Sequence, residues 1–273
     1  MRTHWYAAAV ASLLEMKHQY GIHLALFQPS RLGLVVAPTS NPGQTIPMRG
    51  VGALALDHAA VLAANGPMFD NCSGQPSLPP GNAAYAASHC SVLRYRGVDR
   101  SRSINAPGTP GASLDGMTIS VVGGRAVATV ANVVPPGASV AVQLYPALLS
   151  NGHVLATADR DTDRVQRAGL FIMADGRLGL AMGPGLSMLS FANAAKLNGA
   201  LSGGYTDGGG SARWALRDGT WYGASEDRPV ASWIVIRDNS ISAETLLGLA
   251  FGMGAVGAGL WVISTFRTGR RKQ

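Results

Sequence analysis

The segment Thr206-Asp207-Gly208-Gly209-Gly210-Ser211 lies between two strand-like runs, residues 200–205 and 211–216. Three consecutive glycines permit positive φ angles and let the backbone approach a ligand closely. Successive N–H groups in such a turn can bind an anion, and Asp207 places a carboxylate beside them. The segment is therefore either a ligand-binding loop or an ordinary hairpin turn, and the rest of the sequence is needed to decide between the two.

Short apolar runs that alternate with turn residues fill most of the chain, a pattern typical of strands. One helix is expected from Ser187, a good N-cap, to Asn198, and another near the N-terminus over residues 1–14. Many strands and few helices predict a single α+β domain with a mixed, largely antiparallel twisted sheet. The expected strands are 32–37, 61–64, 92–95, 117–122, 126–130, 139–144, 154–157, 169–173, 178–182, 200–205, 211–216 and 231–236.

The net charge of +7 is concentrated at the C-terminus. Four of the 22 Lys and Arg residues lie in the last seven positions, which leaves 18 basic residues against 15 acidic residues in 1–266. That part of the chain therefore carries only +3 and shows no basic stripe with interleaved aromatic residues. Nucleic acid is not an expected partner.

Residues 245–266 form a run of 22 residues without any charge, bracketed by Glu244 and Arg267. About 20 apolar residues span a bilayer as a helix, so the run predicts a C-terminal transmembrane helix, with a buried core segment as the alternative. The domains are then 1–241, which is folded, and 242–273, which is the membrane helix with its basic tail. Gly248 and Gly252 form a GxxxG spacing that could pair two such helices into a homo-oligomer.

The basic tail predicts a single-pass protein whose C-terminus is cytoplasmic and whose domain is extracytoplasmic. The N-terminus lacks the cleavage region of a clear signal peptide, so the route across the membrane is left open. Cys72 and Cys90 would form a disulfide in an exported domain, and two buried free thiols are the alternative.

Metal binding is not expected, because the six histidines are scattered and no metal-ligand spacing occurs. Asp159, Asp161 and Asp163 resemble the start of an EF-hand loop. However, Arg164 stands where that loop needs Gly, and Leu170 where it needs Glu. A solvated loop is therefore expected here, with a weak calcium site as the alternative, and no other cofactor is predicted.

Three further segments accompany the glycine loop in a fixed order: Asn65-Gly66 after a strand, 167–178 with an Asp-Gly-Arg turn, and Arg-Pro-Val at 228–230 before the last strand. Over residues 20–237 this set resembles the phosphodiester glycosidase family. That family has Asn-Gly-Gly-Phe-Phe, then Arg-Thr-Ala-Ile-Gly with an Asp-Gly-Arg hairpin, a helix, Leu-Asp-Gly-Gly-Gly-Ser-Ser, and Arg-Pro-Val.

The resemblance implies a hydrolase that cleaves a sugar–phosphate glycosidic linkage through an oxocarbenium-like transition state. Asp207 would be the general base or nucleophile, with Asp70 the second choice, and the Arg167 fork would hold the phosphate. The loop N–H groups would stabilise the leaving phosphate. The expected site residues are catalytic Asp207, Asp70 and Arg167, and substrate-binding Asn65, Gly208, Gly209, Gly210 and Ser211.

The expected function is thus that of a bacterial or phage hydrolase, tethered to a membrane, acting on a phosphorylated glycan or envelope polymer. Ala168 and Ala212 replace the family's Thr and second Ser. This departure favours the alternative, a catalytically degenerate glycan-binding surface or virion protein of the same fold.

Overall fold

The computed structural model describes residues 13–36, 60–67, 93–99, 116–130, 133–155, 158, 162–225 and 232–237. The chain divides into a unit of residues 1–237 and a unit of residues 238–273, and every described residue belongs to the first. No helix in these described ranges is long and apolar enough to cross a membrane. Several predicted features lie outside the described residues: nearly all of the N-terminal helix, the transmembrane helix, Asp70, Cys72, Cys90, Asp159 and Asp161.

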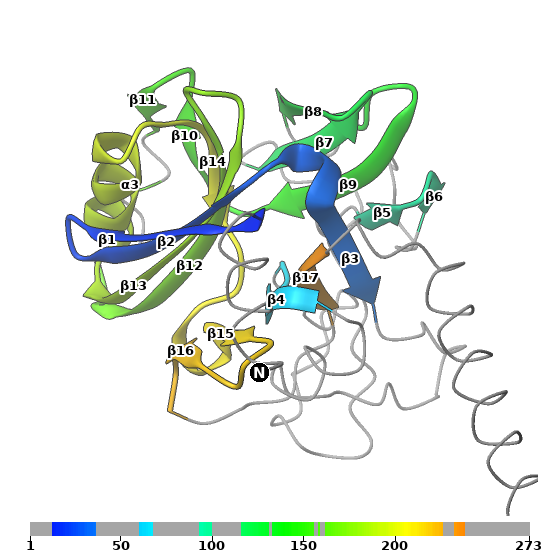
Figure 1. Ribbon diagram of the computed structural model, residues 1–273. Coiled ribbons are helices and arrows are strands. Elements are labelled where there is room, and N and C mark those ends of the chain that lie inside the picture. Colours follow the sequence, from blue (N-terminus) through cyan, green and yellow to red (C-terminus); the bar gives the residue numbers. More distant parts are fainter. Residues whose placement is uncertain are drawn as a thin grey trace, which may run out of the picture. The chain divides into compact units, whose positions relative to one another are not determined.

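The described residues of the first unit form three sheets (Figure 1). The largest has the strand order β1-β2-β13-β12-β14-β10-β11. Every strand pair in it is antiparallel. Its strands are β1 (Glu15–Gln19), β2 (Ile22–Phe27), β10 (Ala147–Ser150), β11 (His153–Val154), β12 (Val165–Met173), β13 (Leu178–Leu186) and β14 (Ala200–Tyr205).

The two smaller sheets have five strands each, in the orders β16-β15-β4-β17-β3 and β6-β5-β9-β7-β8, and are antiparallel throughout. The first contains β3 (Leu32–Val36), β4 (Ala60–Asn65), β15 (Arg213–Leu216), β16 (Trp221–Gly223) and β17 (Ser232–Arg237). The second contains β5 (Leu93–Tyr95), β6 (Val98–Asp99), β7 (Met117–Val122), β8 (Arg125–Val130) and β9 (Ala138–Leu144).

The α+β prediction is confirmed in its main point, since the described strands are antiparallel and few helices accompany them. The expected single mixed sheet is instead three antiparallel sheets within the described ranges. Most predicted strands are present within a few residues of their expected bounds. The hairpin of β1 and β2 was not predicted as two strands, because β1 is a mostly exposed edge strand with the polar sequence Glu-Met-Lys-His-Gln and no apolar alternation.

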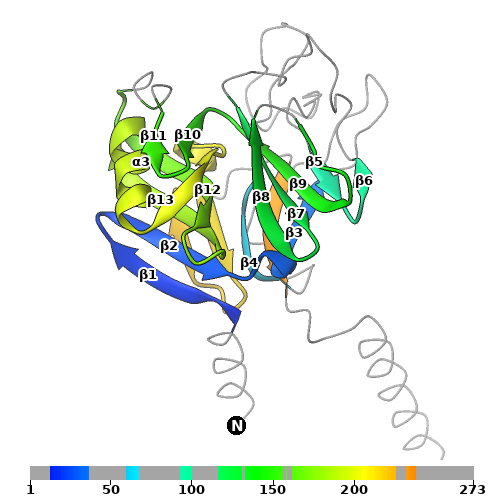
Figure 2. The ribbon, with the colours of Figure 1, turned by 90° about the horizontal axis from the view of Figure 1, so that it is seen from above.

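The predicted helix is α3 (Met188–Leu197), and its start is set by Ser187. The Ser187 hydroxyl accepts a hydrogen bond from the Ser190 N–H at 3.2 Å, as an N-cap does. Figures 1 and 2 show α3 lying along one face of the seven-stranded sheet. Phe191 of α3 is fully buried there and packs against Phe171 of β12, with 5.9 Å between ring centroids.

Glycines in the central strands make room for this helix. A Cβ at Gly169 would lie 3.1 Å from the Phe191 ring, and one at Gly183 would lie 3.2 Å from it. The same two positions would also press on Phe171 and Ile22. Part of the glycine excess of the sequence is therefore explained by close packing between sheet and helix.

The opposite face of the seven-stranded sheet contributes to a core that all three sheets share. Leu170 and Leu180 come from the seven-stranded sheet, Leu62 from β4, and Ile119 and Val142 from the second five-stranded sheet. All five side chains are essentially fully buried. The described part of the chain is therefore one domain in which a shared apolar cluster joins the three sheets.

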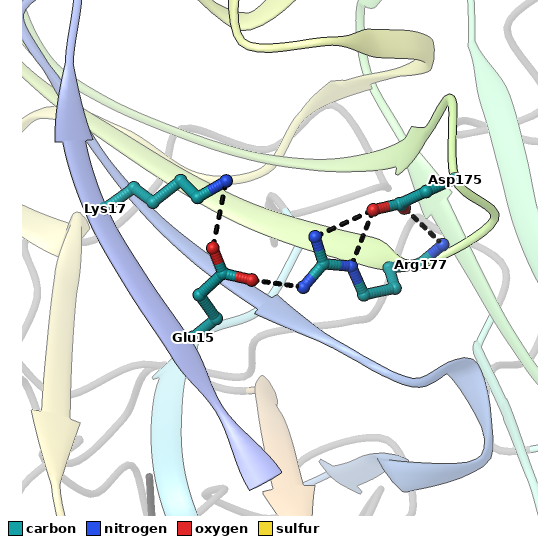
Figure 3. Close-up of polar contacts among 4 residues, drawn as sticks. All are labelled: Glu15, Lys17, Asp175 and Arg177. Carbon is teal, nitrogen blue, oxygen red and sulfur yellow. Dashed lines mark hydrogen bonds and ion pairs between the residues drawn. The ribbon is translucent and has the colours of Figure 1, made fainter. Parts of the chain in front are cut away.

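An exposed ion-pair network fixes the edge strand β1 to the turn between β12 and β13 (Figure 3). Arg177 pairs with Glu15 of β1 at 2.5 Å and with Asp175 at 2.7 Å, and Lys17 pairs with Glu15 at 2.9 Å. The Asp-Gly-Arg segment noted in the sequence thus forms this turn. Hydrogen bonds from Arg177 hold the pKa of Glu15 and the pKa of Asp175 below their usual values.

This network predicts a pH-dependent contribution to stability. A carboxyl whose pKa is lowered by folding stabilises the protein above its unfolded pKa, and this contribution is lost as the pH falls through the folded pKa. Glu15→Gln should therefore lower the free energy of unfolding at pH 7 by less than about 1 kcal/mol, because exposed ion pairs are screened by solvent. Urea unfolding of both proteins between about pH 5 and pH 2 should show the difference shrinking toward zero. A difference that stays constant over this range would contradict the prediction.

Candidate functional site

The glycine loop carries the chain from one sheet to another. It leaves β14 of the seven-stranded sheet and enters β15 of the first five-stranded sheet, as the yellow trace in Figure 1 shows. Within it, Gly209–Ser211 form a 3-10 turn, with the Ser211 N–H donating to the Gly208 carbonyl at 3.2 Å. Because β14 and β15 are not paired with each other, the hairpin-turn alternative is wrong.

The side chain of Asn65, at the end of β4, joins the two ends of this loop. Its Nδ2 donates to the Asp207 carbonyl at 2.6 Å, and its Oδ1 accepts from the Arg213 N–H at 3.2 Å. Asn65 is only 1% exposed, so its amide makes both hydrogen bonds from a buried position. The structure thus brings the predicted Asn65 and Asp207 together, with Asn65 holding the backbone of the loop.

Gly66 completes this attachment from the next position. Its carbonyl accepts from the Asp207 N–H at 3.2 Å, and its own N–H donates to the Ser232 carbonyl at 2.8 Å. A Cβ at Gly66 would lie 2.3 Å from the Ser232 hydroxyl and 2.8 Å from the Ser232 carbonyl carbon. A glycine is required here because β17 passes too close for any side chain. Both backbone groups of Asp207 are therefore fixed by the Asn65-Gly66 pair.

The loop presents a carboxylate next to backbone donors. Asp207 is partly exposed, and its Oδ1 accepts from the Gly208 N–H at 2.9 Å. Within the described ranges, no acceptor is found for the N–H groups of Gly209 and Gly210. Gly209 has a φ of +59° and open space where a Cβ would be, and Gly210 is exposed. These two N–H groups can therefore bind an anion that reaches the loop.

Arg167 lies behind the loop and is 1% exposed. Its Nε donates to the Leu186 carbonyl at 3.0 Å and its Nη2 to the Asp163 carbonyl at 2.6 Å. Its Nη1 is 3.5 Å from the Tyr205 hydroxyl, and its Cζ is 5.5 Å from the Tyr205 ring centroid. The geometry gives Arg167 a supporting position; binding of phosphate by this residue stays a prediction.

Tyr205 transmits this support to the loop, and it was not among the predicted site residues. It is buried, and its hydroxyl occupies the place where a Cβ of Gly208 would be. Only a glycine at 208 leaves that room. The arrangement runs from the buried Arg167 through Tyr205 to the backbone next to Asp207.

Ser211 and Asp70 are the remaining predicted site residues. Ser211 is 3% exposed and closes the 3-10 turn through its backbone, so the structure gives no access to its hydroxyl. Asp70 lies outside the described residues, as does most of the aspartate-rich segment apart from Asp163. Among the residues that the structure describes, no group of three metal-ligating side chains occurs.

Arg213 and Trp221 also lie at this site and were not predicted. The Arg213 Cζ is 4.4 Å from the centroid of the Trp221 ring, and its Nη1 donates to the carbonyls of Ala224 and Ser225, both at 3.1 Å. Trp221 is 46% exposed. The Asp218-Gly219 turn could have indicated the hairpin that makes Arg213 and Trp221 diagonal neighbours.

No family model matches the chain, and no curated protein matches its sequence. Solved structures do resemble it. One is the catalytic domain of zebrafish N-acetylglucosamine-1-phosphodiester alpha-N-acetylglucosaminidase, auto-inhibited by its pro-peptide. It has a TM-score of 0.57 and 14% identity, over 83% of this chain and 82% of that one. Another is a Burkholderia pseudomallei protein with a TM-score of 0.50 and 14% identity, over 80% of this chain and 74% of that one. At this identity the likeness is one of fold.

The Asn65 attachment predicts a large effect of a small change. Asn65→Ala removes both hydrogen bonds of an amide that is 1% exposed, at a cost of about 2–4 kcal/mol. Denaturant unfolding of the full chain measures this loss. Asn193→Ala is the matched control, because Asn193 is an exposed helix residue with one hydrogen bond to Leu189, and it should change stability by less than about 0.5 kcal/mol. Equal effects of the two substitutions would contradict a special contribution of the Asn65 side chain to stability.

Proposed function

We propose that the chain is a glycoside hydrolase that cleaves the bond between a sugar and a phosphate, with water as the acceptor of the sugar. The observation that carries the proposal is the Asn65 attachment, which holds the Asp207 carboxylate and the Gly209 and Gly210 N–H groups on one rigid loop. The name of the zebrafish enzyme, whose domain this fold resembles, places a sugar phosphodiester in its substrate. A phosphorylated glycan or envelope polymer is the corresponding substrate class here.

The chemistry follows from the charges involved. As the glycosidic bond breaks, positive charge develops on the sugar ring and negative charge on the departing phosphate. The Asp207 carboxylate stabilises the positive charge on the sugar. It either attacks the sugar carbon itself or acts as a general base that activates the attacking water. The N–H groups of Gly209 and Gly210 bind the phosphate oxygens in the same step. A phosphate leaves readily as an anion, so little general acid catalysis is needed. Asp70, five positions after Asn65, is the second carboxylate of the proposal.

Arg167 contributes its buried charge to the same loop from behind, in addition to its predicted contact with phosphate. Its guanidinium lies beside the Tyr205 hydroxyl, which packs against Gly208. A fixed positive charge near the loop favours binding of an anion even without direct contact. This role requires no movement of the side chain away from the carbonyls of Asp163 and Leu186.

A second candidate is a glycan-binding surface or virion protein that has lost turnover. The observation in its favour is that Ala168 and Ala212, which replace the family's hydroxyl residues, are both buried beside the loop. The backbone of Ala168 still supports the loop, because its carbonyl accepts from the Thr206 N–H at 3.0 Å. Loss of the two hydroxyls would then remove catalysis while the loop keeps its shape.

Asp207→Asn separates the two candidates. The amide keeps an acceptor for the Gly208 N–H and removes the negative charge, so the loop should fold while hydrolysis of a sugar 1-phosphate methyl diester falls by about 10²–10⁴-fold. Asp218→Asn is the matched control, because Asp218 also accepts a backbone N–H, from Thr220 at 2.8 Å, but on an exposed turn. It should keep full activity. Equal hydrolysis by both variants would refute the catalytic role of Asp207. No hydrolysis by the unmodified chain would refute the hydrolase and leave the binding protein.

We further propose that residues 245–266 anchor the protein as a single membrane-spanning helix, with the basic tail in the cytoplasm and the domain outside it. The support is the uncharged 22-residue run and the cluster of Arg267, Arg270, Arg271 and Lys272 behind it. Gly248 and Gly252 are the proposed contact points for self-association.

Deletion of residues 245–273 tests the anchor. The full chain should sediment with membranes and resist extraction by carbonate, whereas the shortened chain should be recovered in the soluble fraction. Immunoblotting of both fractions measures the distribution. A shortened chain that still resists extraction would refute the anchor at this position.

A further inference from the structure

We propose that Arg213 and Trp221 form a subsite for the group on the far side of the phosphate, in which Arg213 binds the phosphodiester and Trp221 stacks on a second sugar ring. The proposal rests on the proposed function, since it assigns the part of the substrate that Asp207 does not attack. It makes this pair the determinant of selectivity for the leaving group.

Trp221 has the position of a contact residue for a ligand. It lies on β16, the edge strand of its sheet, and is 46% exposed. Trp214 and Trp233 of the same sheet are at most 1% exposed and belong to the core, whereas Trp221 does not. The exposed indole offers an apolar, electron-rich face, which suits the C–H face of a pyranose ring.

Arg213 orients that indole and is itself held in place. Its guanidinium stacks on Trp221 at 4.4 Å, and Nη1 is anchored by the carbonyls of Ala224 and Ser225. These hydrogen bonds and the stacking contact hold the guanidinium beside the exposed indole. A fixed guanidinium next to an aromatic ring is suited to a sugar ring that carries a phosphate.

The pair is joined to the catalytic loop through a single side chain. The Arg213 N–H and the Asp207 carbonyl both bind the amide of Asn65, at 3.2 and 2.6 Å. Arg213 is also two residues beyond the end of the 3-10 turn at Gly209–Ser211. A phosphodiester bound at Gly209 and Gly210 would therefore lie near the start of β15, and Trp221 is on β16, the strand that pairs with β15.

The geometry favours a sugar over an isolated anion as the occupant. A free phosphate would use Arg213 and the loop N–H groups but gain nothing from Trp221. A diester with a sugar on its far side uses all three, because the ring can cover the exposed indole. We therefore expect the subsite to discriminate between diesters that differ only in this substituent.

Titration calorimetry tests this on the full chain carrying Asp207→Asn, which prevents turnover. The probes are two diesters of glucose 1-phosphate, one with a methyl group and one with the 6-oxygen of methyl glucoside. The sugar-bearing diester should bind about fivefold more tightly. Adding Trp221→Ala should abolish that preference, and adding Trp221→Phe should retain part of it. Adding Arg213→Gln should weaken both probes, and Tyr20→Ala, which removes an exposed aromatic ring from the β1–β2 turn, should change neither.

The outcomes separate this proposal from the proposed function. A preference that survives Trp221→Ala, equal binding of the two probes, or no binding of either would overturn the subsite. If the unmodified chain hydrolyses the two diesters equally well and binds them equally, the subsite is refuted and the hydrolase stands. A preference that depends on Trp221 in a chain that hydrolyses neither probe would leave the subsite and remove the hydrolase. Circular dichroism of each variant checks that loss of binding does not reflect unfolding.

Discussion

The carboxamide of Asn65 is the contact on which the arrangement of the site depends. A carboxamide can bridge the two ends of the loop, because its Nδ2 donates to the Asp207 carbonyl and its Oδ1 accepts from the Arg213 N–H. No carboxylate could make both bonds, since it lacks the donor. The amide is buried, so loss of either hydrogen bond would leave one of its own polar atoms unsatisfied. One side chain from β4 thereby joins the two ends of the loop that connects the two sheets.

Arg167 shows how the same site manages a buried charge. Removing a guanidinium from water is costly unless its donors are satisfied, and here two backbone carbonyls and the Tyr205 hydroxyl meet them. Loss of the Arg167 side chain would therefore remove a contact of the Tyr205 hydroxyl, and this hydroxyl fills the space next to Gly208. Arg213, by contrast, is partly exposed and stacks on the exposed Trp221.

Local signals predicted much of the fold. Ser187 marked the start of α3, and apolar runs between turn residues marked most strands. What local signals could not supply was which strands pair, because β14 and β15 are neighbours in sequence yet belong to different sheets. Asn65 and Asp207 were named as site residues from their motifs, but the burial of Arg167 depends on long-range packing. Arg213 and Trp221 were missed for the same reason, since their contact exists only once β15 and β16 pair.

The passage of the glycine loop between two sheets links ligand binding to the stability of the whole domain. A ligand that needs the loop in this shape can bind only when both sheets are folded and β4 is in place, so it has no affinity for a chain in which either sheet has opened. Its binding energy then adds to the free energy of unfolding, by about 2.7 kcal/mol at a concentration 100 times its Kd. The melting temperature of the domain is consequently a general reporter of occupancy, and a library of sugar phosphates can be searched by heating alone, before any reaction product is known.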